Sequence, residues 1–202
     1  MFFEPKNGHG LPHDPFRAIV APRPIGWVST ISSDGVINLA PYSFFNAVAG
    51  RPPMVILSSE GIKDSITNIE ASREFVVNLA TLPMAKRMNE TSRALSSDID
   101  EFEFAGLEPA ASSLVRPPRV AGCPAALECK VTDMVPLKNL AGETGERLMT
   151  IAEVVGIYID ENYLTDGMFD MVKAQTLARC GYWDYQVTTE LFDMPRPDLP
   201  DH

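Results

Sequence analysis

Apolar and polar positions alternate over several short stretches of the chain, a pattern of strands rather than of long helices. The clearest case is a pair of β-branched and aromatic stretches at residues 27–32 and 36–40. Asp34-Gly35 lies between them, and this dipeptide accepts the positive φ of a tight hairpin turn. We therefore expect a β-hairpin whose side chains alternate between the two faces of each strand.

Four further strands are predicted, over residues 53–59, 74–80, 125–134 and 148–158, the last being the longest. Short helices interrupt them: Asp64 is predicted to be the N-cap of one, and Pro83 suits the first turn of a second. Strands and helices do not alternate regularly. The pattern therefore favours a mostly β protein with short helices, of α+β or barrel architecture, over a doubly wound sheet.

The two ends differ in composition from the rest of the chain. Residues 1–16 are rich in Gly, Pro and His and are expected to form an N-terminal arm, and the Pro- and Asp-rich residues 193–202 an extended C-terminal tail. No linker or internal repeat separates them, so we interpret residues 1–202 as a single domain. Without an apolar run of about 20 residues or a secretory signal at the N-terminus, we expect a cytoplasmic protein with no membrane span.

The net charge and the numbers of cysteines and histidines argue against several functions. A formal net charge of −10 argues against binding to nucleic acid or to anionic membranes, where Lys and Arg must offset phosphate charge. The three cysteines have no CxxC spacing, and the three histidines lie near the ends. We expect neither a metal centre nor a histidine-dependent triad, so an enzyme of this sequence would depend on chemistry other than its own acid-base side chains.

Residues 40–53 form the first candidate ligand segment. Prolines bracket aromatic residues together with Ser43 and Asn46, so backbone N–H groups and short polar side chains could face a flat heteroaromatic ligand. Spacing alone favours the alternative, a corner between strands with its aromatic side chains in the core. Neither a GxGxxG motif nor a P-loop is present.

Residues 58–65 form the second candidate. Serine hydroxyls, a glycine, Lys63 and the start of a helix lie within eight residues, a combination that suits a phosphate because helix-end amides and their dipole attract anions. Asp64 would then orient the loop. The alternative is a capped helix with a solvated lysine.

Several blocks of the sequence resemble the flavin reductase-like proteins, which include flavoredoxins and the reductase components of two-component monooxygenases. Weaker similarity continues at residues 124–129 and 154–158. The blocks that carry the resemblance are Arg23-Pro24-Ile25-Gly26-Trp27-Val28-Ser29-Thr30, Asp34-Gly35 followed by Asn38 to Asn46, Pro52-Pro53, Lys63-Asp64-Ser65 with Asn68-Ile69, and Glu74-Phe75-Val76-Val77-Asn78.

The resemblance implies an FMN-binding split β-barrel of Greek-key type, usually a homodimer with the flavin near the subunit interface. It places hydroxyls and Lys63 at the phosphate and residues 43–46 at the isoalloxazine ring. A looser match adds an arginine and a tyrosine near the C-terminus. The expected cofactor-binding residues are Trp27, Ser29, Thr30, Ser43, Phe44, Phe45, Asn46, Ser58, Ser59, Lys63, Asp64, Ser65, Arg179 and Tyr182, with no catalytic side chain and no metal.

The resemblance also implies a function: an NAD(P)H-dependent flavin reductase that supplies reduced flavin to a partner oxygenase. The alternatives are a flavoredoxin-like electron carrier that retains FMN, a non-catalytic flavin-binding module, and a structural β-barrel without flavin. In a flavoprotein the cofactor carries the redox chemistry, so the scarcity of interior histidines is consistent with the reductase, the electron carrier and the flavin-binding module.

Overall fold

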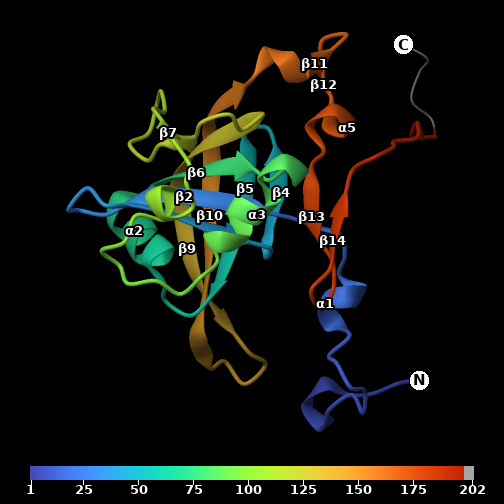
Figure 1. The fold of residues 1–202 in the computed structure, drawn as a ribbon. Helices are drawn as coiled ribbons and strands as arrows, with labels where there is room; N and C mark the ends of the chain where they lie inside the picture. The colour runs from blue at the N-terminus through green and yellow to red at the C-terminus, as the bar shows by residue number, and fades with distance from the viewer. Residues whose placement is uncertain (198–202) are drawn as a thin grey trace.

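The computed structural model describes residues 1–197 and is dominated by one antiparallel sheet of seven strands, in the order β3-β2-β6-β9-β10-β5-β4 (Figure 1). The strands of this sheet are β2 (Gly26–Ile31), β3 (Ile37–Tyr42), β4 (Phe45–Gly50), β5 (Pro53–Glu60), β6 (Glu74–Leu79), β9 (Ala125–Lys138) and β10 (Thr144–Ile159).

The predicted strands are present. The hairpin is β2–β3, with Gly35 in its turn at a φ of 88°. The other four predictions correspond to β5, β6, β9 and β10, and β10, with 16 residues, is the longest of the described strands. The sequence did not predict β4, because residues 46–50 are all exposed and show no alternation of burial.

The order of the strands in the sheet differs from their order in the sequence, as in a split barrel. Hairpin β4–β5 follows β3 in sequence yet lies at the opposite edge of the sheet, next to β10, as Greek-key connections allow. The far end of the β9–β10 hairpin extends beyond the other strands (Figure 1). The mostly β, split-barrel fold predicted from the sequence is confirmed.

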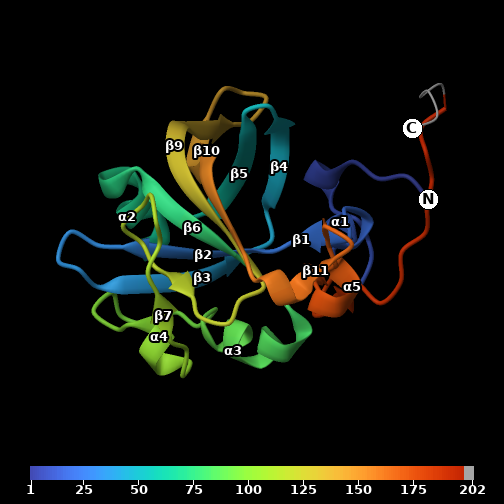
Figure 2. The ribbon, with the colours of Figure 1, turned by 90° about the horizontal axis from the view of Figure 1, so that it is seen from above.

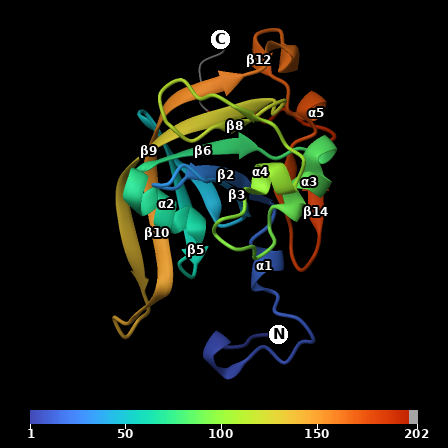
Figure 3. The same cartoon turned by 60° about the vertical axis from the view of Figure 1, so that its left-hand side comes forward.

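The helices are short and cover parts of the barrel. Helix α2 (Asp64–Ser72) packs on β2 and β3, while α3 (Ala85–Glu90) and α4 (Glu101–Phe104) lie beside β3 (Figures 2 and 3). Fully buried Trp27 and Phe102 belong to the core between these helices and the sheet. Each such side chain contributes about 1.5–3 kcal/mol by its removal from water.

One helix start differs from its prediction. Asp64 is the first helical residue of α2 rather than its N-cap, and the preceding Lys63 is extended with no capping side chain. The Asp64 carboxylate therefore sits in the first turn, where the helix dipole favours negative charge. Pro83 does lie in the first turn of a helix, the 3₁₀ turn η2 (Leu82–Met84) that leads into α3.

A second, three-stranded sheet joins the two ends of the chain beside the barrel (Figure 1). It consists of β1 (Arg23–Pro24), β13 (Leu177–Arg179) and β14 (Tyr185–Val187), next to α1 (Phe16–Ile19). Residues 198–202 of the predicted tail lie outside the described part. The remaining elements are η1 (Pro5–Asn7), β7 (Pro109–Ala110), β8 (Arg119–Val120), η3 (Glu161–Tyr163), β11 (Leu164–Thr165), β12 (Met168–Phe169) and α5 (Met171–Ala174).

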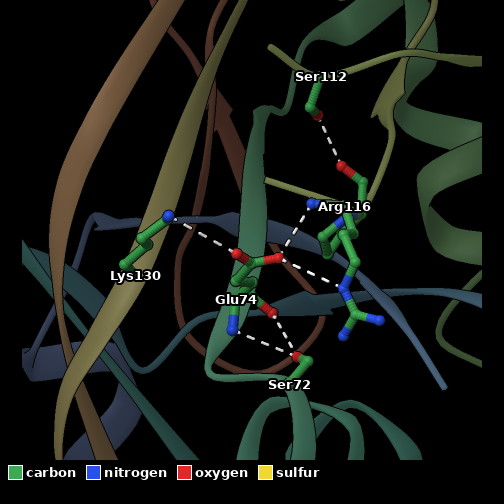
Figure 4. A network of polar contacts seen from close by, with 6 residues as sticks. Ser72, Glu74, Ser112, Arg116 and Lys130 are labelled. Atoms are coloured by element: carbon green, nitrogen blue, oxygen red, sulfur yellow. Dashed lines mark hydrogen bonds and ion pairs between the residues drawn. The ribbon is translucent and has the colours of Figure 1, made fainter. Parts of the chain in front are cut away.

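The loop between β7 and β8 is held on the sheet by two carboxylates. Glu128 is buried and accepts hydrogen bonds from the backbone N–H groups of Ser113 (2.8 Å) and Leu114 (2.6 Å). Glu74 accepts one from the N–H of Arg116 at 3.0 Å and also lies 3.8 Å from Lys130 Nζ (Figure 4). Among residues 1–197, none of the helices is long and apolar enough to cross a bilayer.

Candidate functional site

Two adjoining cavities form a groove over the end of β3. The first has a volume of about 350 Å³ and the second of about 420 Å³. Both are lined by Pro41, Tyr42 and Ser92, so an elongated ligand could extend from one into the other. These volumes lie within the range of small-molecule and cofactor sites.

The second cavity is built from one face of β3 and the start of α2. Asn38, Ala40 and Tyr42 line it because alternate residues of a strand point to the same side. Lys63–Ser65 form its opposite edge, with the free amide end of α2 next to them. Helix N-termini attract anions, and the exposed Lys63 adds a positive charge, so this end of the groove suits a phosphate.

A buried polar network underlies the second cavity. Ser65 Oγ donates to Asn38 Oδ1 at 2.7 Å, and Asn38 Nδ2 donates to Glu101 Oε1 at 2.9 Å. Glu101 Oε2 accepts from the N–H of Leu39 at 3.2 Å. Burial raises the pKa of the Glu101 carboxyl, although these hydrogen bonds oppose the rise. The network fixes the positions of β3, α2 and α4 relative to one another.

Tyr42, at the junction of the two cavities, has a buried hydroxyl without a hydrogen-bond partner among the described residues. The nearby hydroxyls already donate elsewhere, Ser65 to Asn38 and Ser59 to the carbonyl of Gly61 at 2.8 Å. Burial raises the pKa of Tyr42, and Ser65 and Ser59 only partly oppose it. The phenol thus stays protonated at neutral pH, and its unpaired O–H is suited to a ligand in the groove.

The first cavity lies between the second sheet and α3. Arg17 and Arg23 come from the N-terminal side of the chain, Arg179 from the end of β13 and Tyr182 from the turn that follows. Ser43, directly after β3, completes the wall on the barrel side. The cavity therefore combines cationic and aromatic side chains from segments far apart in sequence.

The groove contains only part of the predicted site. Six predicted residues line it: Ser43, Arg179 and Tyr182 in the first cavity, and Lys63, Asp64 and Ser65 in the second. Ser65 is buried and its O–H is directed to Asn38, so its hydroxyl hydrogen is not free for a phosphate.

The hairpin residues predicted for the site are buried behind the side chains that line it. Trp27 Nε1 donates to Thr91 Oγ1 at 3.0 Å within the core. Ser29 Oγ donates to the carbonyl of Pro118, and Thr30 Oγ1 accepts from Asn68 under α2 at 3.0 Å. All three side chains are fully buried, so their hydroxyls and indole stabilise the barrel rather than line either cavity.

Five more predicted residues line neither cavity. Phe44 is half-buried next to Arg17, and Phe45 packs against Gly26, where a Cβ would lie 2.8 Å from its ring. Asn46 is exposed on β4, and its Oδ1 accepts from the N–H of Ala47. Ser58 and Ser59 lie on β5, half-buried and buried. The placement of these five residues at the isoalloxazine ring or the phosphate stays a prediction.

Sequence reasoning missed several residues of the groove. Tyr42 lies in a segment that carries the family resemblance. It is four residues after Asn38 on the second hairpin strand, so both side chains point to the same face, and this spacing could have placed both at the cavity. Arg23 also lies in a segment that carries the resemblance, but the sequence around it does not indicate that β1 pairs with β13. Glu101 gave no signal, because it reaches the groove only through the packing of α4 on β3.

Fold and groove together define a split β-barrel with a candidate small-molecule site at the end of one hairpin. The model of the flavin reductase like domain matches residues 18–176, and the chain belongs to this flavin reductase-like family. An uncharacterized protein of Aquifex aeolicus is 39% identical over 149 residues, covering 71% of this chain and 75% of that protein. One of Halalkalibacterium halodurans is 32% identical over 185 residues, covering 89% of this chain and 88% of that protein.

Solved structures agree with the fold. Nitrilotriacetate monooxygenase component B from Bacillus cereus is 26% identical with a TM-score of 0.86, over 96% of this chain and 98% of that one. The 2-nitrobenzoate 2-nitroreductase NbaA of Pseudomonas fluorescens is 29% identical with a TM-score of 0.80, over 92% and 91% of the two chains. Flavoredoxin of Desulfovibrio vulgaris, at 19% identity and a TM-score of 0.77 over 87% and 91%, shares the fold.

Proposed function

We propose that this chain binds FMN in the groove over β3 and acts as an NAD(P)H-dependent flavin reductase that supplies reduced flavin to a partner oxygenase. The observation that carries the proposal is the unpaired, buried hydroxyl of Tyr42 at the junction of two cavities, one of which ends at Lys63 and the start of α2. Membership of the flavin reductase-like family supports the choice of flavin.

The residues that line the groove support FMN as its ligand, with one exception. Lys63 and the N-terminal amides of α2 would hold the phosphate, while Asp64, on the same edge, counts against it by its charge. Ser65 would act indirectly, by fixing Asn38 and the start of the helix. Tyr42 would donate a hydrogen bond to the ligand, and Ser43 would lie near the ring.

When bound, FMN would supply the redox chemistry, accepting a hydride from a reduced nicotinamide and passing electrons on. The protein would bind and orient it and exclude water from part of the groove. None of the side chains of the groove has to act as a proton donor or acceptor in this scheme. The similarity to a monooxygenase component B supports an oxygenase as partner.

The proposal is tested first by the visible absorption spectrum of the purified protein, before and after anaerobic addition of NADH or NADPH. Flavin bands that bleach with either donor are the expected result. Bands that persist would instead support a carrier reduced by another protein. Absence of flavin bands, also after incubation with FMN, would contradict the proposal.

The phosphate end is tested by Lys63→Ala, with the exposed Lys138→Ala as control. We expect Lys63→Ala to weaken FMN binding by about 1–3 kcal/mol through loss of a charge-assisted hydrogen bond. Riboflavin lacks the phosphate, so its affinity should not change in either variant. Equal losses for FMN and riboflavin, measured by fluorescence titration, would mean that Lys63 does not contact the phosphate.

A further inference from the structure

The turn between β13 and β14 forms one wall of the first cavity and lies directly against α1. Cys180, Tyr182 and Trp183 of this turn line the cavity. Gly181, between them, is so close to α1 that a Cβ at this position would lie 2.4 Å from Ala18 Cβ and 2.6 Å from Ala18 Cα. Only glycine, which has no Cβ, permits this approach without a shift of the helix. The position of α1 and the conformation of the turn are therefore coupled.

Tyr182 has a backbone conformation that its surroundings must enforce. Its φ of 54° lies in the left-handed region, which is disfavoured for a residue with a Cβ. The Arg179 guanidinium donates to the Tyr182 carbonyl at 2.6 Å. The ring of His13, from the N-terminal arm, has its centre 5.5 Å from that of Tyr182 and 5.9 Å from that of Trp183. Such conformations persist where the structure around them holds them, often at functional sites, so the orientation of this wall depends on contacts with the N-terminal segment.

Arg23 connects α1 to the turn. Its side chain is only 7% exposed, and it donates to the carbonyls of Arg17 and Val20 at α1 and, at 2.9 Å, to that of Cys180 in the turn. The last carbonyls of a helix have no partner within the helix, so these bonds hold α1 from outside. The planar guanidinium carries five N–H donors in a fixed fork and can serve three carbonyls at once, whereas a lysine ammonium is a compact point charge.

The stability of the fold alone does not account for an arginine at this position. Arg23 lies directly opposite Arg179 in the β1–β13 pair, and like charges in this arrangement are destabilising. Within residues 1–197, neither of these arginines forms an ion pair with a carboxylate. Both line the first cavity. The arrangement therefore costs stability at the place where the candidate site needs a fixed wall.

We propose that Arg23 is a positioning residue of the flavin site: its guanidinium holds α1 and the β13–β14 turn together, and so sets Tyr182 and Trp183 in the wall of the first cavity. This inference rests on the proposed function, because it concerns the cavity in which Ser43 and the flavin ring would lie. Arg23 acts through the geometry of its hydrogen bonds and not through its charge on the ligand. Arg23→Lys, which keeps the charge but not the fork, should therefore have the same effect as a disturbance of the contact between α1 and Gly181.

The test measures the affinities of Arg23→Lys and Gly181→Ala for FMN and for riboflavin by fluorescence titration. Both variants should lose about tenfold, or about 1.4 kcal/mol, for each flavin, because the wall faces the ring that the two flavins share. The visible circular dichroism of the flavin at saturation should also change in both variants, whereas a purely structural role of Arg23 would leave it unchanged. Arg196→Lys, in the exposed tail, and Gly145→Ala, where the added Cβ meets only Arg147 Nη1 at 3.6 Å, are the matched controls and should equal the wild type.

Four results would overturn the inference: wild-type affinity in Arg23→Lys, wild-type affinity in Gly181→Ala, a loss confined to FMN, or an unchanged circular dichroism spectrum of the saturated variants. A loss confined to FMN would place Arg23 at the phosphate. If urea unfolding shows that Arg23→Lys does not fold, Gly181→Ala decides alone, because it changes neither a charge nor a hydrogen-bonding group. A wild type that binds neither flavin contradicts the proposed function and this inference with it, whereas in each of the four results the wild type binds both.

Discussion

The groove contains a polar side-chain group, the Tyr42 hydroxyl, that has no hydrogen-bond partner among the described residues. A buried hydroxyl without a partner costs about 1–3 kcal/mol, so a residue such as Tyr42 makes the ligand-free protein less stable than it could be. The same group can recover this free energy when a ligand accepts its hydrogen bond. At this scale, stability and binding are therefore expected to change in opposite directions.

Tyr42→Phe tests that expectation. The variant should raise the free energy of unfolding of the ligand-free protein by about 1 kcal/mol and weaken FMN binding by a similar amount, because the unpaired hydroxyl is removed. Thr150→Val is the matched control: Thr150 Oγ1 is also buried without a partner in residues 1–197, but it lies on β10 and lines neither cavity. Urea unfolding and flavin titration should show both effects for Tyr42→Phe and only the first for Thr150→Val. Unchanged FMN affinity in Tyr42→Phe would remove this residue from the site.

Glu101 gives a pH-dependent prediction. Burial raises its pKa in the folded protein, so the folded state binds the proton more tightly than the unfolded state. Its contribution to stability is complete below the ordinary glutamate pKa and is lost as pH rises through the raised value. The stability of the wild type relative to Glu101→Gln should therefore be greater at about pH 4 than at about pH 7. The exposed Glu103→Gln on the same helix should show no such trend in urea unfolding, and an opposite slope for Glu101→Gln would contradict the assignment.

At the scale of elements, local patterns predicted regular structure far better than they predicted which faces meet. The β2–β3 hairpin followed from a turn dipeptide and two β-favouring stretches. Its polar residues Ser29 and Thr30 were expected at a ligand, yet they bond to Pro118 and Asn68, which lie 89 and 38 residues further along the chain. A hydroxyl on a strand looks the same in sequence whether it meets a ligand or another loop.

The loop between β7 and β8 provides a prediction at this scale. Glu128→Ala leaves two backbone N–H groups without their carboxylate acceptor and should lower the free energy of unfolding by about 2–4 kcal/mol. Glu74→Ala should cost less, about 1 kcal/mol, because one N–H bond is lost and the ion pairs of Figure 4 are partly solvated. Urea unfolding measures both, with the exposed Glu161→Ala as reference. A larger loss for Glu74→Ala would mean that the ion pairs hold the loop.

At the scale of the whole molecule, the groove exists because distant segments meet. Its first cavity joins α1, the end of β3 and the turn after β13. The family resemblance predicted that Lys63 and Arg179 bind the cofactor, but the local sequence pattern could not show that they line two adjoining cavities of one groove. That information lies in the pairing of β1 with β13 and in the packing of α4 on β3, both of which are long-range.

The exposed edge of the large sheet leads to a prediction about assembly. At one edge α3 and α4 pack beside β3, whereas β4 at the other edge contacts β1 and presents exposed Asn46 to Gly50 without a charged residue. Exposed edge strands without charged residues invite pairing with another chain. We therefore expect the homodimer implied by the family resemblance to cover β4, with a mass in solution near 44 kDa, twice the 22.2 kDa of one chain.

Val48→Lys on β4 tests this arrangement, because Val48 is 51% exposed and a buried lysine at a subunit interface would be unpaired. Light scattering should show a monomer for Val48→Lys and a dimer for Leu140→Lys, which places the same charge at the exposed tip of the β9–β10 hairpin. Flavin retention then adds a second result. If monomeric Val48→Lys keeps its FMN affinity, the groove of one chain is sufficient for binding. If the affinity falls together with the dimer, the partner subunit completes the site. A dimer that survives Val48→Lys but not Leu140→Lys would place the interface on the hairpin instead of on β4.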